Sequence, residues 1–283
     1  MPRRTPAVAG TFYPSSSTVL KKQIEECFLH SLGPGRLSSK TADKEKHPLA
    51  LISPHAGYVY SGPIAAHGYL ELDGRAKPDT VIVIGPNHYG FGTSVSIYPE
   101  GTWVTPLGEV KVNSEIGKKL AEISDVFSLD ELSHLREHSI EVQIPFLQYV
   151  LGSFSLVPIC MLDQSIEAAL EVGKAIAELL SQKSGILLIA STDFSHYEPH
   201  EVAVRKDSIA LDKIMKLEVE TLYRVLREKD ISMCGYGPVA AVLEAARRIQ
   251  ARGAELLRYA TSGDVTGDKS SVVGYASLKI EYP

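Results

Sequence analysis

Three histidines follow three apolar segments that are typical of buried strands. LALIS runs into His55, TVIVIG into His88, and GILLIAS into His196. Because the carboxyl ends of parallel strands meet at one edge of an open α/β sheet, we expect these imidazoles to converge there. Neutral imidazoles from different segments are suited to hold a metal ion, and His55 and His88 are the first candidates for ligands. A single histidine is more often structural, and we interpret the others in this way: His30, His47, His67 and His200.

Two further residues are of types that could take part in chemistry. Asp193 lies three residues before His196, where it is either a carboxylate partner for an imidazole or a cap or turn residue. Cys234 lies in SMCGYGP, directly before a predicted helix whose N-terminal dipole would favour a thiolate. A lone cysteine is usually an inert small hydrophobe, so both interpretations of Cys234 stay open.

The sequence HLREH (134–138) fits the H-x-x-E-H pattern of some zinc peptidases. That chemistry needs both histidines on one face of a helix. Pro145 follows within two turns, and the surrounding sequence marks no third carboxylate ligand. A zinc peptidase is therefore a minor alternative.

Short apolar runs alternate with longer helical patterns along most of the chain, which predicts an α/β fold with a mixed, largely parallel sheet flanked by helices. We expect buried strands at 49–53, 80–85, 154–161 and 185–191. Edge or hairpin strands are expected at 94–98, 102–112, 255–262 and 271–281. Helices are expected at 16–31, 62–73, 113–123, 137–151, 165–182, 200–216, 218–228 and 237–251.

Composition narrows the class of protein. A 283-residue chain with 44% hydrophobic and 22% charged residues is predicted to form one domain over 1–283, with 33–47 as a mobile surface loop. A net charge of −5 argues against general nucleic-acid binding, and we expect small-molecule, peptide or other protein partners. An odd number of cysteines, three, and the lack of long apolar runs predict a cytoplasmic protein that does not enter membranes.

The motifs along the chain resemble those of the Memo family, which includes the mediator of ErbB-driven cell motility and the prokaryotic AmmeMemoRadiSam system protein B. The matching segments span almost the whole chain in order: AGTFYP (9–14), SPHAGYVYSG (53–62), GPNHYG (85–90), EHSIEVQIPFL (137–147), STDFSHY (191–197) and CGYGP (234–238).

The resemblance implies a fold similar to that of class III extradiol dioxygenases, which are non-haem iron enzymes. It implies that His55 and His88 are metal ligands and that Cys234 takes the place of a third. It also implies that His196 is the acid/base histidine, with Asp193 beside it. The residues expected near the same pocket are His138 and Glu141.

The cysteine is a departure from the dioxygenases, which use two histidines and one carboxylate. A thiolate suits iron, copper or zinc, but it is vulnerable where iron meets oxygen, so ring cleavage is in doubt. Our first hypothesis is an iron-dependent oxidoreductase, with Fe(II) as the expected metal and Cu or Zn as alternatives. The second is a non-catalytic protein that binds a peptide, such as a phosphotyrosine peptide, in the same cleft. Phosphate recognition would need basic residues there, and the nearest in sequence are Arg136 and Arg205.

Overall fold

The computed structural model of the chain describes residues 2–39 and 49–281. The expected loop at 33–47 is described only as far as residue 39, so its remainder and His47 lie outside the described residues. The helices are α1 (Ser17–Leu29), α2 (Tyr58–Leu70), α3 (Ser114–Ile123), α4 (Ile144–Leu151), α5 (Ile166–Gln182), α6 (His200–Met215), α7 (Val219–Glu228), α8 (Tyr236–Arg248) and α9 (Ser262–Thr266), with 3₁₀ turns η1 (Leu132–His134) and η2 (Glu141–Gln143).

The strands include the four buried strands that the sequence predicts. They are β1 (Arg3–Arg4), β2 (Leu49–Ser53), β3 (Thr80–Pro86), β4 (Val95–Ile97), β5 (Thr102–Thr105), β6 (Gly108–Val112), β7 (Ser128–Leu129), β8 (Ser155–Met161), β9 (Ile186–Ser191), β10 (His196–Glu198), β11 (Ala254–Thr261) and β12 (Val272–Glu281).

The sheet is parallel at its centre and has antiparallel pairs at both sides, β5 with β6 at one and β12 with its neighbours at the other. Its order is β1-β5-β6-β8-β3-β9-β2-β12-β10, with β11 paired to β12 and with β4 paired to β8 and β7. The strands β6, β8, β3, β9 and β2 run parallel, whereas β12 is antiparallel to β2, β10 and β11. The predicted fold class is confirmed.

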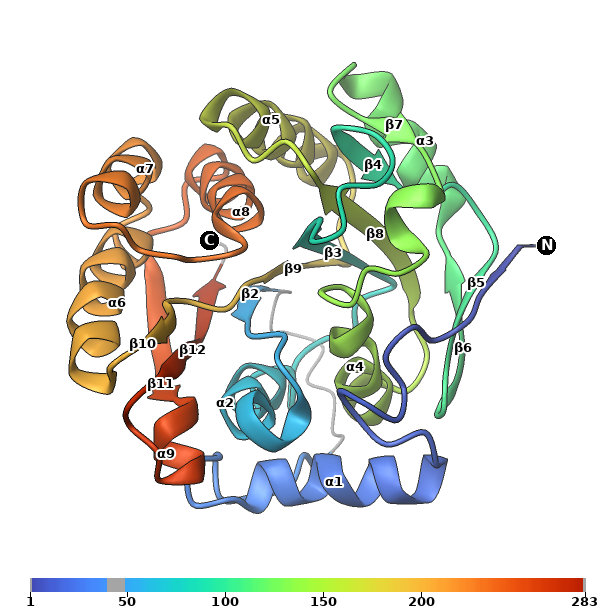
Figure 1. Cartoon of the computed structure of the whole chain (residues 1–283). Coiled ribbons are helices and arrows are strands. Elements are labelled where there is room, and N and C mark those ends of the chain that lie inside the picture. Colours follow the sequence, from blue (N-terminus) through green and yellow to red (C-terminus); the bar gives the residue numbers. More distant parts are fainter. Residues whose placement is uncertain (1, 40–48, 282–283) are drawn as a thin grey trace.

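The central strands are apolar on both faces because helices cover both. Successive side chains point to opposite faces of a sheet, so Ile82 and Ile84 join one core cluster while Val81 and Val83 join the other. The first cluster includes residues of α5, α8 and α6, and the second includes residues of α1, α2 and α4. Figure 1 shows the two groups of helices on either side of the strands.

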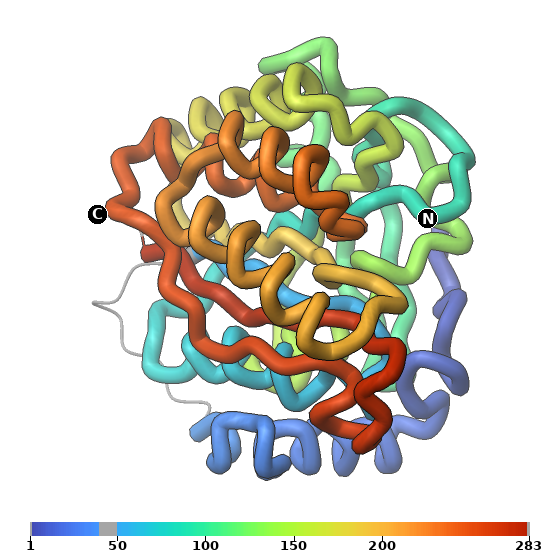
Figure 2. The backbone as a smooth tube through the Cα atoms, turned by 60° about the vertical axis from the view of Figure 1, so that its left-hand side comes forward, coloured from blue at the N-terminus to red at the C-terminus, as the bar shows by residue number. Residues whose placement is uncertain are grey.

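Helices α5 and α8 pack closely on one face of the sheet, as Figure 2 shows along their length. Gly173 of α5 makes this approach possible, because a Cβ atom there would lie 2.6 Å from the carbonyl oxygen of Ala241 in α8. The absence of a side chain at residue 173 therefore allows α8 to pack closely against α5. Helix α8 begins two residues after Cys234, so this packing also places the cysteine.

Three expected elements differ from those observed. The expected strand 102–112 is a hairpin, because β5 and β6 are antiparallel and a turn at Pro106 and Leu107 separates them. The helix expected at 137–151 begins only at Ile144, because the side chains of Glu137, Ser139 and Gln143 form hydrogen bonds with other segments. A short strand, β10, includes His196, where we expected a loop. In the described part of the chain, no helix combines the length and hydrophobicity needed to cross a membrane.

Candidate metal centre

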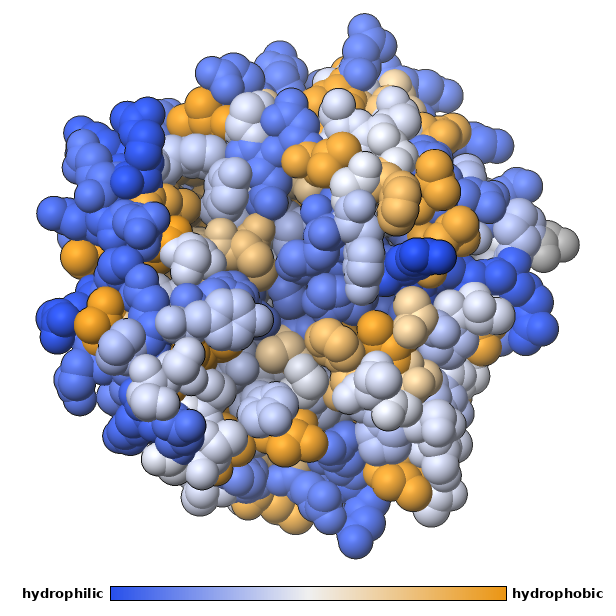
Figure 3. Space-filling view, in the orientation of Figure 1, coloured by the Kyte–Doolittle hydropathy of each residue, from blue (hydrophilic) through white to orange (hydrophobic). Residues whose placement is uncertain are grey.

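A cavity of about 620 Å³ opens where β2, β3 and β9 end, and the carboxyl ends of these strands bring their loops together as expected. Figure 3 shows hydrophilic side chains at the centre of this face, over the strand ends, with apolar side chains around them. The cavity is lined by Phe12, His55, Ala56, Gly57, Tyr60, His88, His138, Asp193, His196, Tyr197, Ser232, Cys234 and Val273.

Three imidazoles form the core of the site. One ligand atom from each of His55, His88 and His138 lies within 4.8 Å of the others, which is a separation suited to one metal ion. The ring of His138 lies 4.6 Å from that of His88 and 5.4 Å from that of His55, measured between centroids. Sequence reasoning placed His138 near the pocket, and the structure makes it part of the cluster.

A chain of buried hydrogen bonds sets the orientation and tautomer of His55. The Ser191 hydroxyl donates its proton to the carbonyl of Ser139 at 2.6 Å, so its oxygen must accept from Nδ1 of His55 at 2.9 Å. The side-chain amide of Gln143 donates to the same oxygen at 2.7 Å. Nδ1 of His55 therefore carries the proton, which leaves the Nε2 lone pair available for a metal.

The Glu137 carboxylate does the same for His88. Oε1 accepts from Nδ1 of His88 at 2.9 Å, and Oε2 accepts from the backbone N–H of His88 at 2.7 Å. Oε1 also accepts the backbone N–H groups of His138 and Ser139 at 2.9 and 2.8 Å. Burial alone would raise the pKa of Glu137, but these bonds and the neighbouring imidazoles lower it to about 2. A carboxylate behind a ligand histidine is the usual outer partner in metal sites.

The imidazoles of His55 and His138 are neutral at physiological pH. Burial lowers the pKa of His55 well below its usual value, and the nearby His138, His88 and His196 lower it further. Burial likewise lowers the pKa of His138 to about 4, although the Glu137 carboxylate opposes the shift. Neutral imidazole is the form that binds metal ions, so the donor chemistry fits a divalent metal.

Cys234 lies against this cluster. Its Sγ atom is 3.2 Å from Nε2 of His55 and accepts a hydrogen bond from the backbone N–H of Asp193 at 3.2 Å. Burial and the Asp193 carboxylate raise the pKa of the thiol, so the S–H group donates to His55 in the metal-free protein. Gly235 allows this approach, because a Cβ atom there would lie 2.3 Å from the carbonyl oxygen of Ser191.

His196 lies at the same cavity, and the Cys234 loop holds it. Its backbone N–H donates to Ser232 Oγ at 2.8 Å, and its Nδ1 lies 2.8 Å from the carbonyl oxygen of Ser232. A carbonyl only accepts, so Nδ1 carries the proton and Nε2 is free to accept another. Tyr197 beside it adopts a positive φ of 59°, which aims its side chain at the cavity mouth.

Asp193 lies against His55 as well as near His196. Its Oδ1 accepts the backbone N–H of His55 at 2.8 Å, and its Oδ2 lies 4.0 Å from Nε2 of the same residue. Burial raises the pKa of Asp193 to about 6, although the hydrogen bond from His55 and the nearby His196 oppose the shift. The carboxylate thus lies beside the imidazole cluster.

The structure contradicts the zinc-peptidase interpretation of HLREH. His134 ends the turn η1, and no helix connects it to His138. The His134 ring is fully buried and bonds Ser96 Oγ through Nε2 at 3.1 Å. The two histidines therefore do not share a helical face. The Glu137 carboxylate between them accepts a hydrogen bond from His88 instead.

Glu141 lies on the far side of the same segment. It does not line the cavity, because its carboxylate pairs with the buried Arg4 guanidinium and accepts the hydroxyl of Tyr13 at 2.5 Å. Among the described residues, no lysine or arginine lines the cavity, so Arg136 and Arg205 do not provide the phosphate contacts that a phosphopeptide would need.

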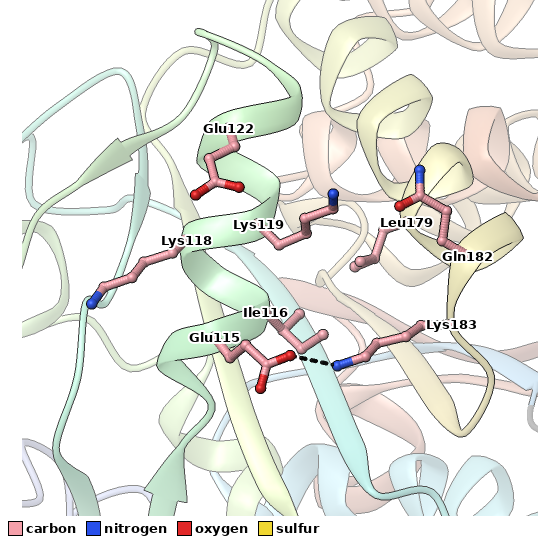
Figure 4. Close-up of a pocket in the computed structure, with 8 residues that line it drawn as sticks. All are labelled: Glu115, Ile116, Lys118, Lys119, Glu122, Leu179, Gln182 and Lys183. Atoms are coloured by element: carbon pink, nitrogen blue, oxygen red, sulfur yellow. Dashed lines mark hydrogen bonds and ion pairs between the residues drawn. The ribbon is translucent and has the colours of Figure 1, made fainter.

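A second hollow lies between α3 and α5 (Figure 4). It is lined by charged and aliphatic side chains, among which Glu115 and Lys183 form an ion pair at 2.9 Å. Histidine and cysteine do not occur among its lining residues, so the metal-capable chemistry of the described chain is gathered at the first cavity.

Sequence reasoning missed the residues that orient the imidazoles. Ser191 ends a buried strand, Glu137 lies at the start of EHSIEVQIPFL, and Gln143 interrupts the apolar part of that segment. All three are almost fully buried. Polar residues in a segment that is expected to be buried could have identified them, because buried polar groups need hydrogen-bond partners.

Comparisons with known proteins find relatives that match this chain over nearly its whole length. A model of the Memo family, described as "Memo-like protein", matches residues 4–279. A MEMO1 family protein of Sulfolobus acidocaldarius is 49% identical over 98% of both chains. A MEMO1 family protein of Thermotoga maritima is 48% identical over 97% of this chain and 98% of its own.

A solved structure supports the fold alone. The crystal structure of an uncharacterized protein from Escherichia coli K12 matches with a TM-score of 0.55 at 17% identity, covering 82% of this chain and 99% of its own. The family match spans nearly every described element, including those that carry the three imidazoles. This chain belongs to the Memo-like protein family.

Proposed function

We propose that this protein is a metal-dependent redox enzyme with an iron ion at the imidazole cluster. His55 and His88 would hold the metal, with Cys234 and His138 as further donors. The observation that carries the proposal is the cluster of three imidazoles within 4.8 Å, two of which have a fixed Nδ1–H tautomer. Iron would supply one-electron redox chemistry to a bound substrate.

The protein's own groups would bind the substrate and move protons. Nε2 of His196 is free to accept a proton, because the Ser232 carbonyl holds the proton on Nδ1. The Asp193 carboxylate, at the same cavity, would be a second proton-accepting group. Phe12, Tyr60 and Tyr197 offer apolar surface around the opening, which would limit the access of water to a bound substrate.

Metal loading of matched variants tests this function. Metal-free protein is loaded anaerobically with Fe(II), Cu(I) or Zn(II), and bound metal is measured by elemental analysis for the wild type, four alanine variants of cavity residues and one control variant. We expect one tightly bound iron ion per chain, lost in His55→Ala and His88→Ala. His30→Ala is the control, because this histidine lies outside the cavity.

The remaining variants assign the other donors. A ligand thiolate gives a sulfur-to-metal charge-transfer band in the Co(II) form, and Cys234→Ala should remove that band. His138→Ala should weaken binding without removing it. Wild-type affinity in all four cavity variants would refute the metal site, and a bound ion that undergoes no redox reaction would refute the redox function.

A further inference from the structure

We propose that Arg4 and Glu141 are positioning residues for the metal centre. They connect the N-terminal segment, residues 2–13, to the segment that carries Glu137 and His138, and so fix the positions of the imidazoles relative to one another. The inference rests on the proposed function, because it concerns the same metal site. It adds that the N-terminal segment is a structural part of this site.

The Arg4 side chain, only 1% exposed, is directed at one segment. Its Nε donates to the carbonyl oxygen of His134 at 2.9 Å, and its Nη2 donates to the carbonyl oxygen of Glu137 at 2.7 Å. Its Nη1 forms the ion pair with Glu141, and the guanidinium stacks over Trp103 at 4.2 Å. The planar donor pattern of arginine therefore holds both ends of residues 134–141.

Glu141, in the segment that Arg4 contacts, forms hydrogen bonds back to the N-terminal segment. Its carboxylate accepts the backbone N–H groups of Ala7 and Val8 at 2.8 and 3.1 Å, and the hydroxyl of Tyr13 at 2.5 Å. All of these donors belong to the N-terminal segment. Arg4 and Glu141 together form a reciprocal clamp between the two segments.

The clamped N-terminal segment reaches the imidazole-bearing loops. The Phe12 ring lies 4.7 Å from the ring of His138, and its carbonyl oxygen accepts the backbone N–H of Tyr58, three residues after His55. Glu137, whose carbonyl Arg4 holds, in turn orients His88. The segment therefore contacts, directly or through one residue, all three loops that supply imidazoles.

The chemistry of the clamp favours a positioning role over simple stabilisation. Burying a carboxylate and a guanidinium costs desolvation energy that an apolar pair of similar volume would avoid. A buried ion pair instead gives defined directions, because each of its hydrogen bonds has a fixed geometry. Here those directions are used on the carbonyl groups of His134 and Glu137, in the segment that leads into His138.

Co(II) titration of matched variants tests the inference, with visible absorption reporting both affinity and coordination geometry. Glu141→Gln neutralises the clamp, and Phe12→Leu removes the ring against His138 while the ionic contacts stay intact. We expect both variants to bind Co(II) about 10-fold more weakly and with an altered spectrum. Arg3→Gln is the control, because Arg3 is exposed in the same strand and should leave both readouts unchanged.

The outcomes separate the two proposals. Folded Phe12→Leu and Glu141→Gln proteins that bind Co(II) like wild type, while His55→Ala does not, would overturn the positioning role and leave the metal site standing. Wild-type protein that binds no Co(II) would overturn both. If Glu141→Gln fails to fold, Tyr13→Phe takes its place, because it removes one hydrogen bond from the Glu141 carboxylate and keeps the ring. A merely structural role would lower its melting temperature without changing the spectrum of the folded form.

Discussion

Replacing Glu137 by glutamine would disturb the imidazole cluster at its most connected point. The carboxylate accepts four hydrogen bonds, from Nδ1 and the backbone N–H of His88 and from the backbone N–H groups of His138 and Ser139. A glutamine amide fills the same volume, but its NH₂ group must face at least one of these donors. Either amide orientation leaves an unsatisfied buried N–H group.

The size of the effect follows from the pKa of Glu137. Its value falls from 4.5 to about 2 in the folded protein, which corresponds to about 3 kcal/mol of stabilisation of the folded state at neutral pH. Because the pKa is lowered, this stabilisation is complete above about pH 4.5 and is lost as the pH falls towards 2. We expect Glu137→Gln to lower the melting temperature at pH 7 by roughly 5–10 °C.

Metal affinity should fall as well, because the His88 ring loses the partner that fixes its tautomer. Outer-partner substitutions typically weaken metal binding by about 10–100-fold, and chelator competition with Co(II) or Zn(II) measures this change. Glu26→Gln is the matched control, since this exposed glutamate pairs only with Lys22 across one helical turn. A folded Glu137→Gln protein with wild-type melting temperature and metal affinity would refute the reasoning.

Three further changes test other parts of the structure. Burial lowers the pKa of His134 to about 3, so its contribution to stability should be complete above about pH 6.5 and decline towards pH 3. The free energy of unfolding in urea should therefore depend less on pH in His134→Gln than in the wild type, and an equal pH dependence would count against this assignment. Gly173→Ala should cost about 1–3 kcal/mol, because the new Cβ atom would meet Ala241, and a neutral result would show that α5 and α8 can separate freely. Ser191→Ala should weaken metal binding about 10-fold, because Nδ1 of His55 loses its hydrogen-bond acceptor. Metal titration of the folded variant measures this change, and an unaltered affinity would show that the Ser191 hydroxyl does not orient His55.

The buried strands were predictable because their signal is local. Runs such as VIVI (81–84) are apolar at every position, and a strand covered on both faces buries them all. The rule that parallel strands present their carboxyl ends at one edge then placed His55 and His88 together, and the cavity lies there. The helix pattern failed at residues 137–143, because the side chains of Ser139 and Gln143 bond to Pro86 in β3 and Ser191 in β9 instead of continuing a helix.

The sequence by itself thus determined the fold class, the strand-end histidines and, through its motifs, the family. Only the tertiary structure decided how the other groups meet them. His138 enters the cluster because the Glu137 carboxylate binds it and His88 together, and Cys234 reaches His55 because Gly235 lies against the end of β9. Arg4 is far from these residues in sequence and yet contacts their segment. Such contacts depend on side chains brought together from distant parts of the chain, and a local pattern of residue types carries no record of them.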